Sequence, residues 1–308
     1  MKFAVLGAGG VGGIVGGYLA LAGNDVTFIA RGKHLAAIKE NGLLLRTSHR
    51  GDLAVPTAKG CAIDEYDDTP DVIFVCFKYY SLPAAIEFAK RYAGDHTLVI
   101  PLLNVFGTGA VMQKELPGVT VLDGCVYIYG MVESPGIVAQ PASILRIFYG
   151  YRPNQEKKLL PLAQKLEPVL NKAGIDGHFT ENIRRDALQK FSYVSPLGAA
   201  GLYFDAVSGD FLREGEPRKM FVGLIREIEA LGHGMGVKFE ESLVDVNLKL
   251  MDSFTKDLKT SMQRDVAHGG PSEFDGLVHR VSRLGKEYHV STPLYDKISA
   301  WGKEKGIR

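Results

Sequence analysis

An apolar segment that stops at a cluster of glycines is the feature that most constrains how this chain can fold. Residues 2–6, KFAVL, are followed at once by Gly7-Ala8-Gly9-Gly10-Val11-Gly12, which matches the spacing GxGxxG. In this pattern the first glycine permits a tight turn, the second lets the backbone approach a pyrophosphate, and the third lets a helix pack closely on the strand. Residues 11–22 then have helical composition and end at Gly23. This order predicts a dinucleotide-binding unit, with a merely tight turn as the alternative.

Further apolar runs predict the rest of a sheet. Residues 25–30 (DVTFIA), 71–77 (DVIFVCF) and 97–102 (TLVIPL) are nearly continuous in apolar residues. Such runs are typical of parallel strands that are buried on both faces. Residues 119–149 contain shorter strands, interrupted by a turn at Ser134-Pro135-Gly136, and we expect them to form the far edge of the same sheet.

After Pro153 almost every segment has a helical pattern. The expected helices are 154–173, 181–202, 217–231, 239–254, 272–288 and 292–303. Alternating strands and helices followed by helices alone predict two domains. We therefore expect an α/β fold: a Rossmann-type, mainly parallel sheet domain over residues 1–179, followed by an all-α domain over residues 180–308.

Composition narrows the class of protein. Hydrophobic residues make up 46% of the 308 residues and the formal net charge is +1, which gives no reason to expect nucleic acid or an anionic membrane as a partner. No apolar run is long enough to span a membrane. Three scattered cysteines and eight histidines without paired spacing predict neither a disulfide framework nor a metal site. We expect a cytoplasmic protein, for which a homodimer through the helical half is compatible with the sequence but not required by it.

The residues after the second strand indicate which dinucleotide binds. An NAD-binding unit usually places an acidic residue there to bind the ribose 2′-hydroxyl. This chain has Ala30-Arg31-Gly32-Lys33 instead. The planar, permanently charged guanidinium of Arg31 suits a 2′-phosphate, and Lys33 adds a second charge. The pattern predicts NADPH, with a solvated loop arginine as the alternative.

Two polar residues follow predicted strands directly. Lys78 comes after DVIFVCF, and Asn104 comes after TLVIPLL. Ligands of open α/β sheets bind outside the carboxyl ends of the strands, so both residues are candidates for contact with the cofactor. A single lysine or asparagine in such a loop can equally be a cap or a solvated group.

At this point the chain resembles the ketopantoate reductase family along nearly its whole length. The opening MKFAVLGAGGVGG…IARG is similar to that family's N-terminus, and DVIFVCFKYY resembles its strand ending in a cofactor-contacting lysine, matched by Lys78. NVFG keeps the asparagine of an Asn-Gly loop as Asn104. NIRRDALQKFSYV resembles the helix with the catalytic lysine, here Lys190. TSMQRDVAHGGPSEFDGLVHRV is similar to a Ser-Ser-Met…Glu-Ile-Asp motif, which aligns Ser261 and Glu273.

The resemblance implies a site for NADPH-dependent reduction of a 2-oxo acid, with 2-dehydropantoate (ketopantoate) as substrate, in the synthesis of pantothenate. Lys190 would donate a hydrogen bond and a proton to the ketone oxygen, and Glu273 would contact a hydroxyl group. Ser261 would bind the substrate carboxylate, and Asn104 would orient the carbonyl or the nicotinamide. From the residues alone, Lys190 can also be a surface lysine paired with Asp186 one helical turn earlier.

The chain departs from the family where substrate is bound. Family members carry asparagines at three positions that are here Val194, Gly198 and Ser208. A substrate hydroxyl recognised by those asparagines would be left unpaired or bound through water. Two alternatives therefore accompany the expected activity: a reductase of the same mechanism acting on a different, bulkier or more apolar 2-oxo acid, and a non-catalytic sensor that binds NADPH.

Overall fold

The computed structural model describes residues 1–252 and 256–307, which divide into two compact units. The first unit comprises residues 1–103 and 107–183, and the second comprises residues 104–106 and 184–308. The expected order of an α/β unit followed by a helical unit is confirmed. The short segment 104–106 belongs with the helical unit although it lies in the first half of the sequence.

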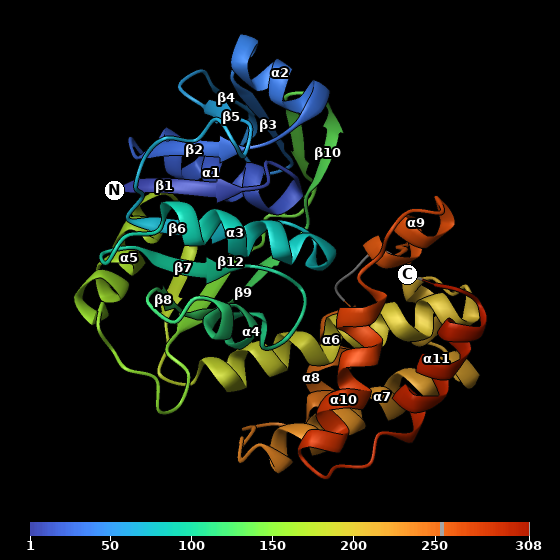
Figure 1. The fold of residues 1–308 in the computed structure, drawn as a ribbon. Coiled ribbons are helices and arrows are strands. Elements are labelled where there is room, and N and C mark those ends of the chain that lie inside the picture. The colour runs from blue at the N-terminus through green and yellow to red at the C-terminus, as the bar shows by residue number, and fades with distance from the viewer. Residues whose placement is uncertain (253–255, 308) are drawn as a thin grey trace. The chain divides into compact units, whose positions relative to one another are not determined.

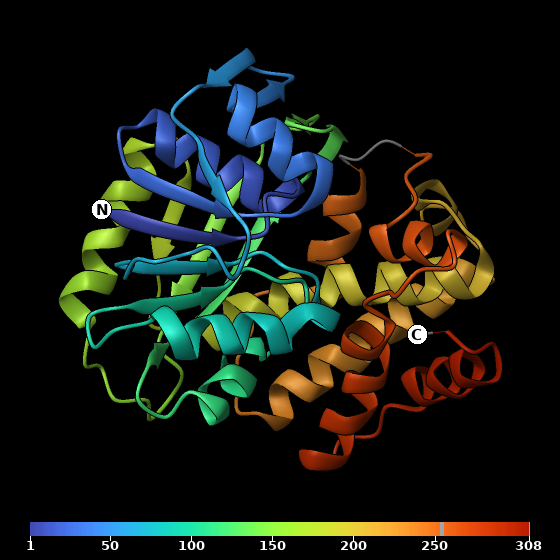
Figure 2. The ribbon, with the colours of Figure 1, turned by 45° about the horizontal axis from the view of Figure 1, so that its top comes forward.

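A six-stranded parallel sheet forms the centre of the N-terminal unit (Figures 1 and 2). Its order is β5-β2-β1-β6-β7-β8, and each neighbouring pair is parallel. The strands are β1 (Lys2–Leu6), β2 (Asp25–Ile29), β5 (Lys59–Cys61), β6 (Val72–Val75), β7 (Leu98–Pro101) and β8 (Thr120–Val121). The central strands are fully buried, which explains their continuous apolar sequences.

Two smaller sheets complete the N-terminal unit, and they correct one prediction. Strands β3 (Leu43–Thr47), β4 (Gly51–Val55), β10 (Met131–Ser134) and β11 (Ile137–Gln140) form a second sheet in the order β10-β11-β3-β4. Strands β9 (Asp123–Ile128), β12 (Leu145–Gly150) and β13 (Asp176–Phe179) form a third. The strands within residues 119–149 were expected at the edge of the main sheet, and only β8 lies there. The prediction was wrong because the local composition of a segment indicates a strand but not the strand with which it pairs.

Helix α1 (Gly10–Leu21) contacts β1 and β2 of the main sheet and also β3 and β11 of the second sheet. Its glycines make this double contact possible. A side chain at Gly16 would collide with the ring of Phe28, and one at Gly13 would lie 2.8 Å from Val138 Cγ2. The helix is therefore buried on both sides, as expected for the first helix of a dinucleotide-binding unit.

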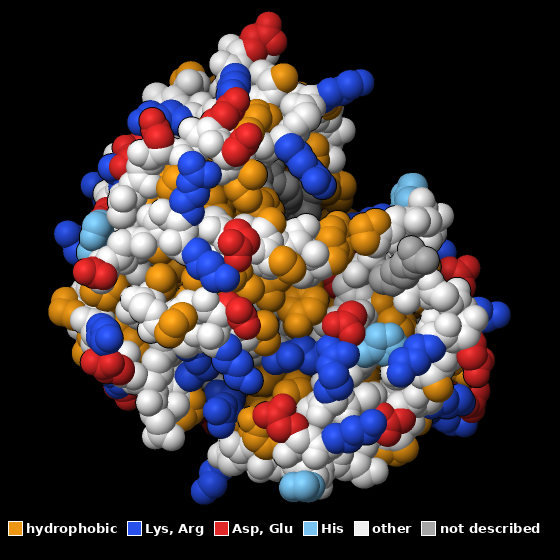
Figure 3. Space-filling model, in the orientation of Figure 1, with side chains coloured by type: hydrophobic (Ala, Val, Ile, Leu, Met, Phe, Trp, Pro, Cys, Tyr) orange, Lys and Arg blue, Asp and Glu red, His pale blue; other side chains and the backbone are white. Residues whose placement is uncertain are grey.

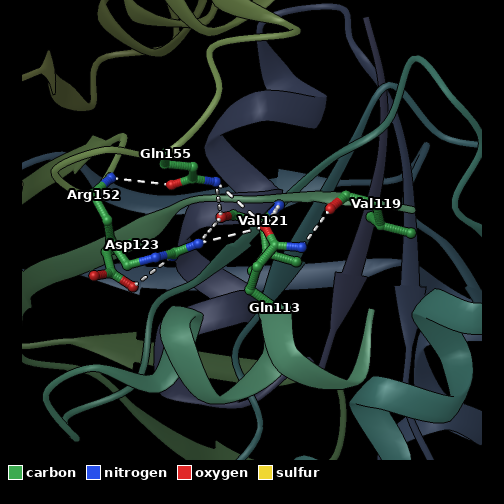
Figure 4. A network of polar contacts seen from close by, with 6 residues as sticks. All are labelled: Gln113, Val119, Val121, Asp123, Arg152 and Gln155. Atoms are coloured by element: carbon green, nitrogen blue, oxygen red, sulfur yellow. Dashed lines mark hydrogen bonds and ion pairs between the residues drawn. The ribbon is translucent and has the colours of Figure 1, made fainter. Parts of the chain in front are cut away.

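The other helices of this unit are α2 (Gly32–Asn41), η1 (Tyr79–Ser81), α3 (Leu82–Tyr92), α4 (Thr108–Glu115) and α5 (Leu160–Lys172). Helix α5 begins later than the predicted residue 154, because residues 151–159 form a loop with turns at 153–154 and 158–159. A network around Arg152 joins these turns to β8, β9 and α4 (Figure 4). Arg152 Nη1 lies 3.1 Å from Asp123 Oδ1, and its Nη2 donates to the carbonyl oxygen of Val121.

The C-terminal unit is helical in the part that the structure describes. Its elements are α6 (Ile183–Phe204), η2 (Ser208–Phe211), α7 (Glu216–Gly234), α8 (Leu243–Asp252), α9 (Ser261–Ala267), a π-helix η3 (Asp275–His279), α10 (Arg280–Glu287) and α11 (Pro293–Glu304). Helix α9 was not predicted. The expected helix 239–254 begins at Leu243, and its last residues, 253–254, lie outside the described residues.

The surface of the N-terminal unit mixes charges of both signs. On the face shown in Figure 3, acidic and basic side chains are interspersed, in keeping with the net charge of +1. No helix in the described part of the chain is long and apolar enough to cross a membrane.

Candidate active site

The glycine turn between β1 and α1 requires glycine at three positions, one of which is Gly10, where a side chain would lie 2.1 Å from the carbonyl oxygen of Gly130. Gly7 has a φ of +101°, and its N–H donates to the carbonyl oxygen of Ile29 at 2.9 Å. A side chain at Gly12 would collide with the carbonyl oxygen of Gly7 and approach Val5 Cγ1 at 2.9 Å. The first and last glycines therefore serve the backbone turn and the packing of helix on strand.

Gly9 has no such packing reason to be glycine. It is the N-cap residue of α1, its φ of −74° suits any residue, and a Cβ there would meet nothing within 4 Å. In the described part of the chain, no hydrogen bond uses the N–H of Gly9. An open space at a helix N-terminus, beside an N–H that has no hydrogen-bond partner among the described residues, fits the binding of a phosphate group.

The loop after β6 lies beside the glycine turn, because β1 and β6 are parallel neighbours. Cys76 N–H donates to the carbonyl oxygen of Leu6 at 2.9 Å, and a Cβ at Gly7 would lie 3.0 Å from Phe77 Cδ1. Lys78 follows directly and is half-buried. The structure thus brings Lys78 to the same edge of the sheet as the turn, as the positions of the two strand ends predicted. Burial raises the pKa of the Cys76 thiol well above its ordinary value, so this cysteine stays a thiol.

Arg31 is the N-cap residue of α2, two residues beyond the end of β2. Its side chain and that of Lys33 are exposed. No hydrogen bond or ion pair of the Arg31 guanidinium is found among residues 1–252 and 256–307. A permanently charged group in this position can bind an incoming phosphate without first breaking an internal pair.

Lys190 and Asn104 meet in the helical unit. Lys190 Nζ donates to Asn104 Oδ1 at 2.6 Å, although the two residues are 86 positions apart. Lys190 lies on α6 and is only 5% exposed. The alternative of a surface lysine paired with Asp186 is therefore wrong: the Asp186 carboxylate is bound by Arg185 through Oδ1, and its Oδ2 has no partner within the described residues.

The segment 104–106 is held in place by residues that sequence reasoning missed. The Phe106 ring packs on the ring of Phe191 with centroids 6.0 Å apart, and Arg280 Nε donates to the carbonyl oxygen of Phe106 at 2.7 Å. Because Phe191 follows Lys190 on α6, the same turn of helix both anchors the segment and binds its asparagine. The only sequence signal was the aromatic residue in NVFG.

Ser261 and Glu273 are both in the helical unit. Ser261 is the first residue of α9, next to the N-cap Thr260, whose hydroxyl accepts from the N–H of Gln263. Glu273 is 3% exposed and precedes the π-helix η3, and its carbonyl oxygen accepts from the N–H of Leu277 at 2.8 Å. Local π-helical windings are frequent at functional sites. The proposed contacts of these two side chains with substrate stay predictions.

The three positions that depart from the family pattern have apolar or internally bonded surroundings. A Cβ at Gly198 would lie 3.0 Å from Met262 Cε and 3.8 Å from Leu277 Cδ1. Val194 is half-buried on the same helix. The Ser208 hydroxyl accepts from the N–H of Leu258 at 3.1 Å. These positions thus offer less polar recognition than three asparagines would.

Comparisons with known proteins agree with this arrangement. The family model described as "Ketopantoate reductase PanE/ApbA" matches residues 3–154, and its C-terminal counterpart matches residues 182–305. The chain is 27% identical over 310 residues to an uncharacterized oxidoreductase, YkpB, of Bacillus subtilis, covering 99% of this chain and 100% of that protein.

It is 28% identical to a 2-dehydropantoate 2-reductase of Mesorhizobium japonicum, covering 97% and 96% of the two chains. Among solved structures it is similar to D-mandelate dehydrogenase with NADH and anilino(oxo)acetate, with a TM-score of 0.87 at 23% identity over 97% of this chain and 96% of that one.

Proposed function

Because the chain belongs to the ketopantoate reductase family, a family of oxidoreductases, we propose that it uses NADPH to reduce the ketone of a 2-oxo acid to the 2-hydroxy acid. The first candidate substrate is 2-dehydropantoate, which would be converted to pantoate. The observation that carries the proposal is the hydrogen bond of 2.6 Å between the buried Lys190 ammonium and Asn104.

Residues of the N-terminal unit would hold the cofactor. The N-terminus of α1 and the open space at Gly9 suit its pyrophosphate, and Arg31 suits the 2′-phosphate of NADPH. Ala8, Gly10 and Val11 would contribute backbone to the same turn, and Lys78 would contact the cofactor beside it. The family supports a nicotinamide cofactor, which when bound supplies a hydride; the choice of NADPH rests on Arg31.

Lys190 would act on the ketone oxygen. That oxygen gains negative charge as the ketone is reduced, and a positioned ammonium stabilises it by a hydrogen bond and then transfers a proton to it. Asn104 accepts a hydrogen bond from one of the three N–H groups of Lys190. This bond fixes the orientation of the ammonium and therefore of its other two N–H groups. Asn104 would also orient the substrate carbonyl or the nicotinamide, Ser261 would bind the carboxylate, and Glu273 would accept a hydrogen bond from a hydroxyl.

A second candidate substrate is a 2-oxo acid with a more apolar side chain. This candidate is supported by two positions on α6. Gly198 lies beside Met262, and Val194 stands where the family pattern has an asparagine. A hydroxyl of 2-dehydropantoate would find no asparagine there, whereas an alkyl or aryl group would lose nothing by leaving water. D-mandelate dehydrogenase shows that the same fold occurs in a dehydrogenase of an aryl 2-hydroxy acid.

Oxidation of NADPH, followed with 2-dehydropantoate and with a panel of alkyl and aryl 2-oxo acids, tests the proposal. The Lys190→Ala variant is expected to lose about 10²–10⁴-fold in kcat, the usual contribution of a general acid. The exposed Lys249 of α8 provides the matched control, because Lys249→Ala should leave turnover unchanged. Binding of NADPH without turnover of any 2-oxo acid would instead identify a sensor.

Cofactor preference is tested separately by Arg31→Ala. Its affinity for NADPH should fall while its affinity for NADH stays the same, because only NADPH carries the 2′-phosphate. Lys39→Ala on the same helix is the control, since Lys39 is already paired with Glu65 at 2.8 Å. An unchanged ratio of the two affinities would remove Arg31 from the 2′-phosphate site.

A further inference from the structure

His34 joins three segments of the N-terminal unit through its two ring nitrogens. It lies in α2, half-buried, with Nε2 at 2.8 Å from the carbonyl oxygen of Ala8. Its Nδ1 lies 3.0 Å from the backbone nitrogen of Gly136. A carbonyl oxygen only accepts and a backbone N–H only donates, so Nε2 carries the hydrogen and Nδ1 is the acceptor. The two contacts therefore assign one neutral tautomer of the ring.

Each of the three segments has a distinct place in the fold. Ala8 belongs to the glycine turn, and α2 is the helix whose N-cap is Arg31. Gly136 forms the turn between β10 and β11, with a φ of +78°, and its carbonyl oxygen accepts from the N–H of Leu44. The contacts of His34 thus connect the glycine turn, the helix that begins at Arg31, and the second sheet.

The contact with Ala8 also sets the direction of an N–H group. A trans peptide is planar, so its C=O and N–H point in opposite directions. The Ala8 carbonyl is directed to His34, and the N–H of the same peptide, that of Gly9, is therefore directed away from α2. This is the N–H that has no partner in the described part of the chain and that lies beside the open space at Gly9.

We propose that His34 is a positioning residue that holds the glycine turn in the conformation that binds the cofactor pyrophosphate. It also fixes the position of this turn relative to Arg31 at the start of α2. The proposal rests on the proposed function, because it names the device that aligns two parts of the same cofactor site. In this role His34 acts through the backbone of Ala8, to which its ring is hydrogen-bonded.

Three substitutions separate this role from simple packing. His34→Ala removes both hydrogen bonds. His34→Gln keeps an acceptor and a donor at about the spacing of the two ring nitrogens, whereas the shorter His34→Asn can keep only the bond from Gly136. His49→Ala is the matched control, because His49 is an exposed histidine of the same unit that contacts Tyr18 and not the turn.

Two measurements are made on each full-length protein. Fluorescence titration gives the dissociation constant of NADPH, and hydrogen exchange of the cofactor-free protein reports the protection of the Gly7 and Gly13 amides, whose hydrogen bonds to Ile29 and Gly9 flank the turn. His34→Ala and His34→Asn should weaken NADPH binding by about fivefold to tenfold and speed exchange in the turn, as expected for the loss of one or two hydrogen bonds. His34→Gln should restore most of both, and the KM for NADPH should change far more than kcat.

Equal NADPH affinity and equal exchange in wild type and His34→Ala would overturn the proposal. So would a His34→Gln variant that is as impaired as His34→Ala, because the role would then not depend on the two hydrogen bonds. If His34→Ala does not fold, the NADPH affinities and exchange rates of His34→Gln and His34→Asn are compared instead, and equal values in these two variants would overturn the proposal. If the wild type binds no NADPH, the proposed function fails, while exchange in the cofactor-free protein still shows whether His34 holds the turn.

Discussion

Replacing Asn104 with alanine tests the candidate site at its central contact. The substitution removes the acceptor that lies 2.6 Å from the Lys190 ammonium. Hydrogen bonds to charged groups contribute about 1.5–3 kcal/mol, and each 1.4 kcal/mol changes a rate or equilibrium constant about tenfold. We therefore expect kcat/KM for the best 2-oxo acid to fall by about 10- to 150-fold. The larger end applies because Lys190 is only 5% exposed, so water cannot easily replace the lost amide.

Asn247 provides a control within the same unit. It is a buried asparagine whose Nδ2 donates to Ser192, at 2.8 Å to the hydroxyl and 3.2 Å to the carbonyl oxygen. Asn247→Ala should lower the free energy of unfolding by about 1–3 kcal/mol, because it leaves buried polar groups unsatisfied. Its kcat/KM per folded molecule should be unchanged. Asn104→Ala should instead lower kcat/KM per folded molecule, in addition to any loss of stability from the buried ammonium.

The assay is steady-state oxidation of NADPH at saturating cofactor, with folding checked by circular dichroism and thermal unfolding. If folded Asn104→Ala keeps kcat/KM within about twofold of wild type, the contact contributes less than about 0.5 kcal/mol to the transition state. Lys190 would then not depend on Asn104, and the proposed arrangement of the ketone site would be refuted.

Further predictions concern the turn, the polar network and pH. Gly9→Ala should fold normally and lose affinity for NADPH, whereas Gly12→Ala should unfold at lower denaturant concentration, because only the second Cβ meets backbone. Arg152→Met removes the guanidinium that pairs with the buried Asp123 carboxylate and should cost about 3–5 kcal/mol in denaturant unfolding. Burial lowers the pKa of His279 below its ordinary value of 6.5, so the folded protein disfavours the charged ring. The stability that neutral His279 contributes is fully present above pH 6.5 and is lost as pH falls through the lowered pKa; a His279→Gln variant should show a flatter dependence of unfolding free energy on pH in this range.

Much of the N-terminal unit follows from local sequence patterns. An apolar strand, a glycine turn and a helix are recognisable within residues 2–22 because turn geometry and burial act on neighbours in the chain. The same holds for β6 and β7, whose residues are apolar and buried on both faces. Strand-end residues such as Lys78 could be placed at one edge of the sheet, since parallel neighbouring strands end on the same side.

Partner choice between distant segments could not be read from such patterns. The short strand-like segments in residues 119–149 were recognisable, but no local pattern in the sequence indicates that β9 and β12 belong to one sheet and β10 and β11 to another. Helix α9 was missed because it is a short helix, stabilised by a capping box at Thr260 rather than by a long apolar stripe.

The candidate site divides along the same line. The sequence by itself determined which residue types were available: a glycine turn, an arginine where an acid is usual, and a lysine on a helix. Only the tertiary structure decided that Asn104 meets Lys190 across 86 residues, and that His34 contacts Ala8 and Gly136 across 26 and 102. Such contacts form because buried polar groups must be hydrogen-bonded. Which groups come within hydrogen-bonding distance depends on the packing of the whole unit and not on the neighbouring residues in the sequence.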